Sequence, residues 1–182
     1  MESIDIKIPP DRIGVLIGRE GSVKKMIEER TECRIKVDSK NGVITLTRGE
    51  NAVGFLKARD VINAIALGFN PEIALKILDD DFTILETIDL SSYISQKAME
   101  RVKGRIIGKE GKMRRLIEET LNVHVSIYDK FVSIIGNFEG VSAAREAIEM
   151  LIDGAQHSTV QKFMERKKRE IEMRSMDWYK IS

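Results

Sequence analysis

The chain has 182 residues, of which 42% are hydrophobic and 32% charged, and its formal net charge is only +1. That length fits one large domain or two small ones. No apolar run approaches the ~20 residues of a membrane span, and the acidic start, residues 1–5, lacks the basic and apolar regions of a signal peptide. The single cysteine, Cys33, excludes an internal disulfide. We therefore expect a cytoplasmic protein that makes no contact with membranes.

In chain order, the first elements are a strand and two helices. Isoleucines alternate with charged residues over positions 4–8, which indicates a half-buried strand. Asp11 is placed to cap a helix that runs to Ile17. After a short glycine-containing link, residues 22–30 predict a second helix with Val23, Met26 and Ile27 on its inward face.

A hairpin and a long helix follow. Alternation over residues 33–37 and a β-rich run over 43–47 indicate two strands, and Asn41-Gly42 between them is a typical hairpin turn. Residues 51–67 predict a helix whose inward face includes Val53, Leu56 and Val61. The order of elements up to residue 67 is therefore β-α-α-β-β-α.

The second half repeats this order with a longer lead. A short helix over residues 71–78 and the acidic run Asp79-Asp80-Asp81 precede a strand over 82–88. Residues 89–101 have no counterpart in the first half, and we expect part of them to extend the next helix. Helix 112–121, strands 123–128 and 131–136, and helix 141–152 complete the second copy, which Gly154 ends. We therefore predict domains at 1–78 and 79–154, followed by a basic C-terminal helix and tail at 155–182.

The repeat is plainest where the first two helices of each half meet. The sequence GVLIGREG at residues 14–21 recurs as GRIIGKEG at 104–111, at a constant offset of 90 residues, and the match continues through the next helix. One Gly-x-x-Gly carries little information. Two copies in the same context indicate a duplicated module, so the loop and the helix after it are the candidate site.

Charge is concentrated on these repeated segments. Residues 101–115 contain seven lysines and arginines against one glutamate, and residues 12–25 contain four against one. The compensating acidic residues lie mainly between the two copies. A glycine pair lets the backbone turn sharply and approach a ligand, and the next helix begins at once, so its free N–H groups form an anion-binding end. We interpret the basic glycine loops as a nucleic-acid interface.

The order of elements and the two loops, Gly18-Arg19-Glu20-Gly21 and Gly108-Lys109-Glu110-Gly111, resemble the type I KH domain. The resemblance implies an α+β fold with two β-α-α-β-β-α units, each a three-stranded antiparallel sheet packed on three helices, plus the C-terminal helix. It also implies that each loop clamps the backbone of about four unpaired nucleotides. The remaining implied RNA contacts are Lys24, Lys25, Arg105, Lys112, Arg114 and Arg115, and the implied apolar groove consists of Ile13, Ile17 and Ile35 in the first domain and Ile106, Ile107 and Val125 in the second.

Two tandem KH domains and a basic C-terminal helix resemble the archaeal counterparts of the eukaryotic small-subunit assembly factor called partner of Nob. That resemblance implies binding of single-stranded ribosomal RNA near the 3′ end of the small-subunit RNA. It also implies a protein partner among ribosome assembly or translation initiation factors. Because the second repeated segment is more basic than the first, we expect the second domain to hold RNA more strongly.

Other functions are weighed on particular residues. Asp79-Asp80-Asp81 could hold Mg²⁺ in a nuclease, but without a second acidic cluster a solvated linker is the preferred interpretation, and we predict no enzyme activity, no metal and no cofactor. His124 and His157 lack an evident partner, and Cys33 is expected in the core. A protein-interaction scaffold, or a KH protein acting on other RNA such as decaying transcripts, remains an alternative. Trp178-Tyr179 could stack on a base or bind a partner, although a disordered tail is expected there.

Overall fold

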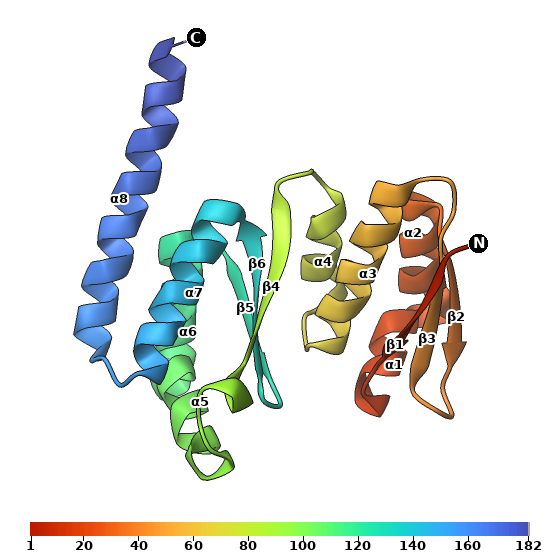
Figure 1. Ribbon diagram of the computed structural model, residues 1–182, viewed down its shortest axis with the longest axis horizontal. Coiled ribbons are helices and arrows are strands. Elements are labelled where there is room, and N and C mark those ends of the chain that lie inside the picture. Colours follow the sequence, from red (N-terminus) through yellow and green to blue (C-terminus); the bar gives the residue numbers. More distant parts are fainter. Residues whose placement is uncertain (182) are drawn as a thin grey trace. The chain divides into compact units, whose positions relative to one another are not determined.

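The computed structural model describes residues 1–181. The chain divides into two compact units, residues 1–85 and residues 86 onward, and each contains one of the two repeated segments (Figure 1). Each unit is described by itself below. None of the helices in the described part of the chain has an apolar stretch long enough to cross a membrane.

The first unit has the predicted order of strands and helices. It comprises β1 (Ser3–Lys7), α1 (Pro10–Ile17), the short helix η1 (Arg19–Gly21), α2 (Ser22–Thr31), β2 (Arg34–Asp38), β3 (Val43–Thr47), α3 (Ala52–Ala66), α4 (Pro71–Ala74) and η2 (Leu75–Leu78). Strand β3 lies between β1 and β2 and pairs antiparallel with both, so that Leu46 is opposite Ile4 on one side and Ile35 on the other. The helices cover one face of this sheet (Figure 1).

The second unit repeats the arrangement and adds a long helix. Its elements are β4 (Thr83–Asp89), η3 (Leu90–Ser92), η4 (Gln96–Ala98), α5 (Met99–Ile107), η5 (Lys109–Gly111), α6 (Lys112–Leu121), β5 (His124–Tyr128), β6 (Phe131–Asn137), α7 (Phe138–Ile152) and α8 (His157–Ile181). The strand order β4-β6-β5 matches β1-β3-β2. The predicted α+β fold class, with two three-stranded antiparallel sheets and a C-terminal helix, is confirmed.

Two predicted inward faces are wrong in part. Val53 and Leu56 of α3 are 57% and 49% exposed, and Met26 of α2 is also exposed. The core face of α3 is formed instead by Phe55, Ala58, Ile62 and their neighbours, which recur at helical spacing. Apolar residues are abundant all around this helix, so periodicity alone did not identify the face that meets the sheet.

Helix ends also differ from the predictions. Helix α1 begins at Pro10, and the residue before it makes no side-chain cap, so Asp11 lies inside the first turn. Proline is favoured there because its missing N–H would be unpaired in any case. Of residues 89–101, only the last three belong to α5, and the preceding residues form the short turns η3 and η4.

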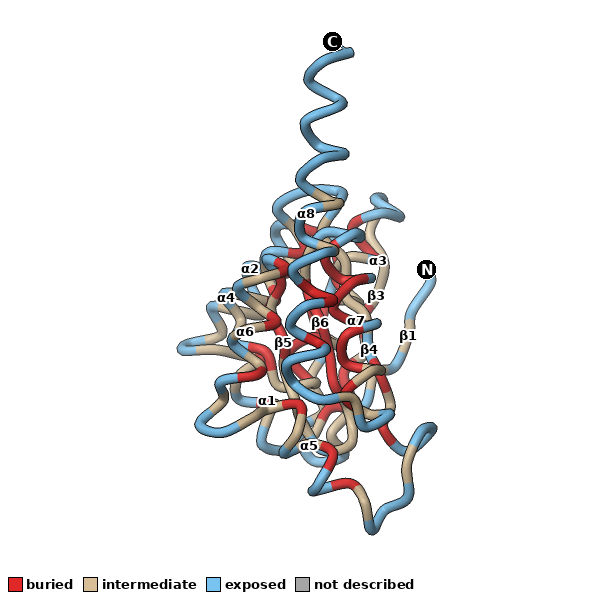
Figure 2. Tube along the Cα trace, turned by 90° about the vertical axis from the view of Figure 1, so that its left-hand side faces the viewer, coloured by how far each residue is buried: buried red, intermediate tan, exposed pale blue. Residues whose placement is uncertain are grey.

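Helix α8 is longer than predicted and continues through Trp178-Tyr179 to Ile181, so the expected disordered tail is wrong. No glycine or proline follows Gly154 in the sequence, so no residue there breaks the helix. Its first turns bury Val160, Phe163 and Met164 against α6 and α7. Beyond these turns the helix is mostly exposed and is coloured pale blue in Figure 2.

In both units a glycine near the start of the third helix lies against the end of the helix that follows the loop. A Cβ atom on Gly54 of α3 would lie 2.6 Å from the carbonyl oxygen of Thr31, and one on Gly140 of α7 would lie 2.6 Å from that of Leu121. The two helices therefore approach each other at backbone distance. This approach fixes the far end of α2 and α6, whose near ends form the glycine loops.

We expect Gly140→Ala to destabilise the protein by about 1–3 kcal/mol, because the new Cβ forces α6 and α7 apart in a packed region. The matched control is Gly104→Ala in α5, where a Cβ would meet no atom within 4 Å and alanine should add about 0.5–1 kcal/mol. Urea unfolding monitored by circular dichroism measures both. Equal midpoints for the two variants would contradict the close approach described above.

Candidate nucleic-acid interface

The two glycine loops have the same backbone conformation. Gly18 and Gly108 have φ of 73° and 74°, and Gly21 and Gly111 have φ of 75° and 76°. The glutamates within the loops also adopt the left-handed conformation, with φ of 55° for Glu20 and 56° for Glu110. Both glutamate side chains are exposed. The repeat seen in the sequence is therefore a repeat of one precise backbone shape.

The two glycines of each loop are needed for different reasons. A Cβ on Gly18 would lie 2.5 Å from Cγ2 of Val23, and one on Gly108 would lie 2.7 Å from the backbone nitrogen of Met113. The first glycine thus brings the loop backbone into contact with the next helix. At Gly21 and Gly111 a Cβ would meet nothing within 4 Å. The second glycine is therefore required only because its φ is positive, and the space where a side chain would lie is open.

Each loop leads directly into the N-terminus of a ten-residue helix. Gly21 and Gly111 are the N-cap residues of α2 and α6, and neither helix has a side-chain cap hydrogen bond. The first N–H groups of a helix have no partner within the helix and carry the positive end of its dipole. An anion such as a phosphate group is stabilised at such a position.

The cations around the second loop fall into two groups. Arg115 braces the loop, because its Nη2 donates to the carbonyl oxygen of Glu110 at 3.0 Å, and Arg114 Nε lies 3.6 Å from Glu118 Oε1. Lys109 and Lys112 are exposed, and neither makes an ion pair with any residue in the range 1–181. Their charge is therefore available to a ligand.

The first loop has a similar division. Lys24 Nζ lies 2.8 Å from Glu28 Oε1, while Arg19 and Lys25 are exposed and have no ion pair within the described chain. Gly18, Gly21 and the exposed Arg19 belong to the loop itself, and Lys25 lies in the first turn of the helix that follows.

Arg105 has a different role from the one expected. Its Nη2 donates to the carbonyl oxygen of Ala155, and its Nε is buried without a partner among residues 1–181. A second contact joins the same two segments: Nε2 of His157 lies 3.0 Å from the carbonyl oxygen of Arg105. The side chain therefore ties α5 to the start of α8, and its charge is not presented at the loop.

Arg12 makes an equivalent contact in the first unit. Its Nε and Nη2 donate to the carbonyl oxygens of Ile65 and Phe69 at 2.8 and 2.7 Å. The basic character of residues 12–25 therefore overstates the charge that the first loop can offer. The sequence did not predict the carbonyl contacts of Arg12 and Arg105. Nothing in the local sequence indicates which carbonyl groups at a helix end lack a hydrogen-bond donor within the helix.

The six predicted groove residues divide by burial. Ile13, Ile35, Ile106 and Val125 are core residues with 7% or less of their surface exposed. Ile17 and Ile107, the last residues of α1 and α5, are half-buried. Of the six, these two present the most surface, directly before each loop.

The acidic run before the second unit is held by ion pairs. Asp79 lies 3.0 Å from Arg30, and Asp81 lies 2.8 Å from Lys57. The carboxylate of Asp80 accepts hydrogen bonds from the backbone N–H groups of Phe82 and Thr83, which lowers its pKa because they stabilise the charged form. In the part of the chain that the structure describes, no three His, Cys, Asp or Glu side chains are grouped to hold a metal ion.

Glu118 lies in α6, the helix that follows the second loop, and the pKa of its carboxyl group is shifted. Partial burial raises the pKa of its carboxyl group, and the nearby Arg114 opposes this effect. Nδ1 of His124 lies 3.9 Å from its Oε2. Burial thus outweighs the attraction of the arginine.

One prediction separates the two glycines of the second loop. Gly111→Ala should cost about 1–2 kcal/mol, the strain of a left-handed residue with a Cβ, because the site is otherwise open. Gly108→Ala should cost more, since the same strain is added to a clash with Met113. Chemical denaturation of both variants measures the difference. A cost for Gly111→Ala equal to or above that of Gly108→Ala would contradict this account.

A second prediction concerns pH. A carboxyl group with a raised pKa binds more protons in the folded state, so its contribution to stability is lost as pH rises from its unfolded pKa of about 4.3 through its folded pKa. Glu118→Gln removes this term. The stability of the variant relative to the unaltered protein should therefore increase across that pH range. Denaturation at several pH values checks this, and a relative stability that stays constant or falls would refute it.

Family models and relatives agree with the geometry. Residues 3–64 match the KH domain model, and residues 84–169 match a model described as a eukaryotic type KH domain, type I. A KH domain-containing protein of Methanocaldococcus jannaschii is 44% identical over 98% of this chain and 80% of that protein. The pre-rRNA-processing protein PNO1 of Coccidioides immitis is 28% identical over 85% of this chain, which spans 63% of that longer protein.

Solved structures are also similar over nearly the whole chain. A protein of unknown function from Aeropyrum pernix has a TM-score of 0.93 at 40% identity and covers 100% of this chain and 98% of that one. Dim2p from Pyrococcus horikoshii has a TM-score of 0.85 at 43% identity, covering 91% and 99%. A complex of a/eIF2alpha, aDim2p and rRNA from Pyrococcus horikoshii contributes a further match with a TM-score of 0.87 at 42% identity, covering 93% and 95%. This chain therefore belongs to the PNO1/Dim2 family of proteins with two KH domains.

Proposed function

We propose that this chain binds single-stranded RNA through its two Gly-x-x-Gly loops, and that its target is small-subunit ribosomal RNA near the 3′ end. The observation that carries the proposal is the shared loop conformation. In each copy an open second glycine and a helix N-terminus without a side-chain cap lie beside exposed lysine or arginine side chains that make no ion pair within residues 1–181. A phosphate group finds N–H donors, a dipole and mobile cations at the same place.

The relatives support the choice of RNA. The PNO1 proteins bear names that assign them to pre-rRNA processing, and a similar chain has been solved in a complex with rRNA and a/eIF2alpha. We extend both to this chain as a proposal: it acts in the cytoplasm on ribosomal RNA during assembly or translation, with an initiation factor subunit as a candidate protein partner. In this role the chain is a binding protein and not an enzyme.

The two loops are proposed to contribute unequally. Lys109 and Lys112 are both exposed beside the second loop, and Arg101 of α5 is exposed as well without an ion pair in residues 1–181. Around the first loop, Arg19 and Lys25 are the cations that are exposed and make no ion pair within the described residues. Each additional phosphate contact strengthens binding and its dependence on salt. The second unit should therefore provide the larger share of affinity.

The test uses fluorescence anisotropy with a labelled RNA of about 20 nucleotides copied from the 3′ end of the small-subunit rRNA, long enough for two sites of about four nucleotides each. Lys109→Asp/Glu110→Asp should weaken binding by about tenfold or more, since it reverses a charge beside the phosphate site. Aspartate tolerates the left-handed conformation at position 110, so the loop should keep its shape.

The matched control is Arg19→Asp/Glu20→Asp, which makes the same kind of change in the first loop and should cause a smaller loss. Circular dichroism confirms that both variants are folded. If both variants bind as tightly as the unaltered chain, the loops are not the RNA site, and the scaffold alternative is favoured. If the unaltered chain binds other single-stranded RNA but not this one, RNA binding stands and the ribosomal target is wrong.

A further inference from the structure

A second basic surface lies on α8, outside both glycine loops. Lys162, Arg166 and Arg169 are spaced four and three residues apart, which places them on one face of the helix. Together with Met150, Thr159, Phe163 and Glu165 they line an open groove of about 680 Å³ between α8 and the end of α7. We call this the α8 groove. It holds three cationic side chains against one acidic side chain.

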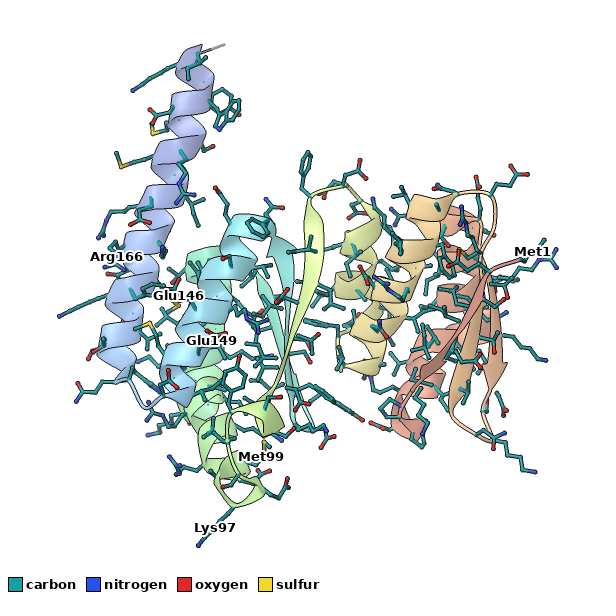
Figure 3. All side chains as sticks on the ribbon, viewed as in Figure 1. Met1, Lys97, Met99, Glu146, Glu149 and Arg166 are labelled. Atoms are coloured by element: carbon teal, nitrogen blue, oxygen red, sulfur yellow. The ribbon has the colours of Figure 1, made fainter. Side chains whose placement is uncertain are left out.

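The cations of the α8 groove are not neutralised within the chain. Lys162 and Arg169 are exposed and make no ion pair with any of residues 1–181. Arg166, labelled on α8 in Figure 3, makes one long ion pair, with its Nε 3.8 Å from Glu170 Oε1. Farther along α8, by contrast, Arg174 is paired with Glu139 of α7 at 3.1 Å. The groove therefore keeps most of its positive charge.

An aromatic ring lies beneath one of these cations, Arg166. Phe163 is buried, and the guanidinium carbon of Arg166 is 5.5 Å from its ring centroid. A cation over an aromatic face is attracted to the ring, which limits the positions that the arginine side chain explores. A planar guanidinium group held in this way is suited to bidentate contact with a phosphate. The groove thus has a partly ordered donor as well as net charge.

The start of α8 is tied to α5, the helix that precedes the second glycine loop. His157, the first residue of α8, contacts the carbonyl oxygen of Arg105 at 3.0 Å, three residues before Gly108. Lys162 follows His157 by five residues, which is about 8 Å along the helix axis. Helix α8 also packs against α6, the helix that begins at the loop. The cations of the α8 groove therefore begin about 8 Å along the helix axis from the contact between α8 and α5.

We propose that the α8 groove binds the phosphate backbone of RNA that extends beyond the nucleotides held by the second glycine loop. This inference rests on the proposed RNA-binding function and adds a binding surface to it. The groove contributes affinity through phosphate contacts and not through base recognition, because its cations read charge and carry no sequence information. A longer RNA therefore binds more tightly than its loop contacts alone allow.

The experiment compares two variants with equal loss of charge on the RNA of about 20 nucleotides used above. Lys162→Gln/Arg169→Gln removes two groove cations. Lys97→Gln/Lys168→Gln is the matched control and removes two exposed lysines of the second unit that have no ion pair within residues 1–181; Lys97 is labelled in Figure 3. The groove variant should lose about tenfold in affinity at 0.1 M salt, and its salt slope should become shallower by about 1.4, or about 0.7 for each phosphate contact.

The control should bind within about twofold of the unaltered chain, since general charge effects are weak compared with direct contacts. A groove variant that matches the control in both affinity and salt slope overturns the inference and makes the groove a protein-facing or solvated surface. Lys109→Asp/Glu110→Asp, measured in the same series, keeps the two proposals distinct. If that loop variant loses binding while the groove variant does not, RNA binding by the loops stands and only the groove proposal fails.

Discussion

The fold depends on contact between backbone and backbone at glycine. In each unit the first loop glycine presses against the helix that follows it, and a glycine in the third helix presses against that same helix at its other end. The helix after the loop is thereby held at both ends by contacts that leave no room for a Cβ atom. Protein interiors are packed densely enough that such contacts cannot relax without moving whole elements. The position of the loop is therefore set by the core and not by the loop residues alone.

A chain with a net charge near zero can still offer a basic site at these loops. Acidic side chains are not excluded from the loops, since Glu20 and Glu110 lie inside them. What distinguishes the site is that ion pairs within the chain neutralise some lysines and arginines and leave others exposed. Arg12 and Arg105 contribute to the charge of the repeated segments, but their guanidinium groups donate hydrogen bonds to backbone carbonyl oxygens. The distribution of partners, and not the sum of charges, determines which cations a ligand can reach.

The sequence was sufficient for the order of elements, because duplicated glycine loops and alternating strands are local signals. It was also sufficient for the loops as candidate sites. It did not predict the inward face of α3, where Val53 and Leu56 are as apolar as the residues that are buried, nor the end of α8, which depends on the absence of a helix-breaking residue. The contacts of Arg105 join residues some 50 positions apart in the chain, so no local pattern predicts them. The groove beside Phe163 depends on how α7 and α8 pack against each other. The sequence indicated a basic C-terminal helix, but not which of its faces forms the groove.

The near identity of the two loop conformations has a consequence for comparative biochemistry. The φ angles of the two glycines and of the glutamate in one loop differ by no more than one degree from those in the other, although the side chains around the loops differ. Any difference in affinity between the loops must therefore arise from the surrounding residues, since the backbone geometry is held constant. Each loop can therefore serve as the reference against which the other loop is compared. Exchanging side chains between the copies can assign the contribution of each to recognition without reference to another protein.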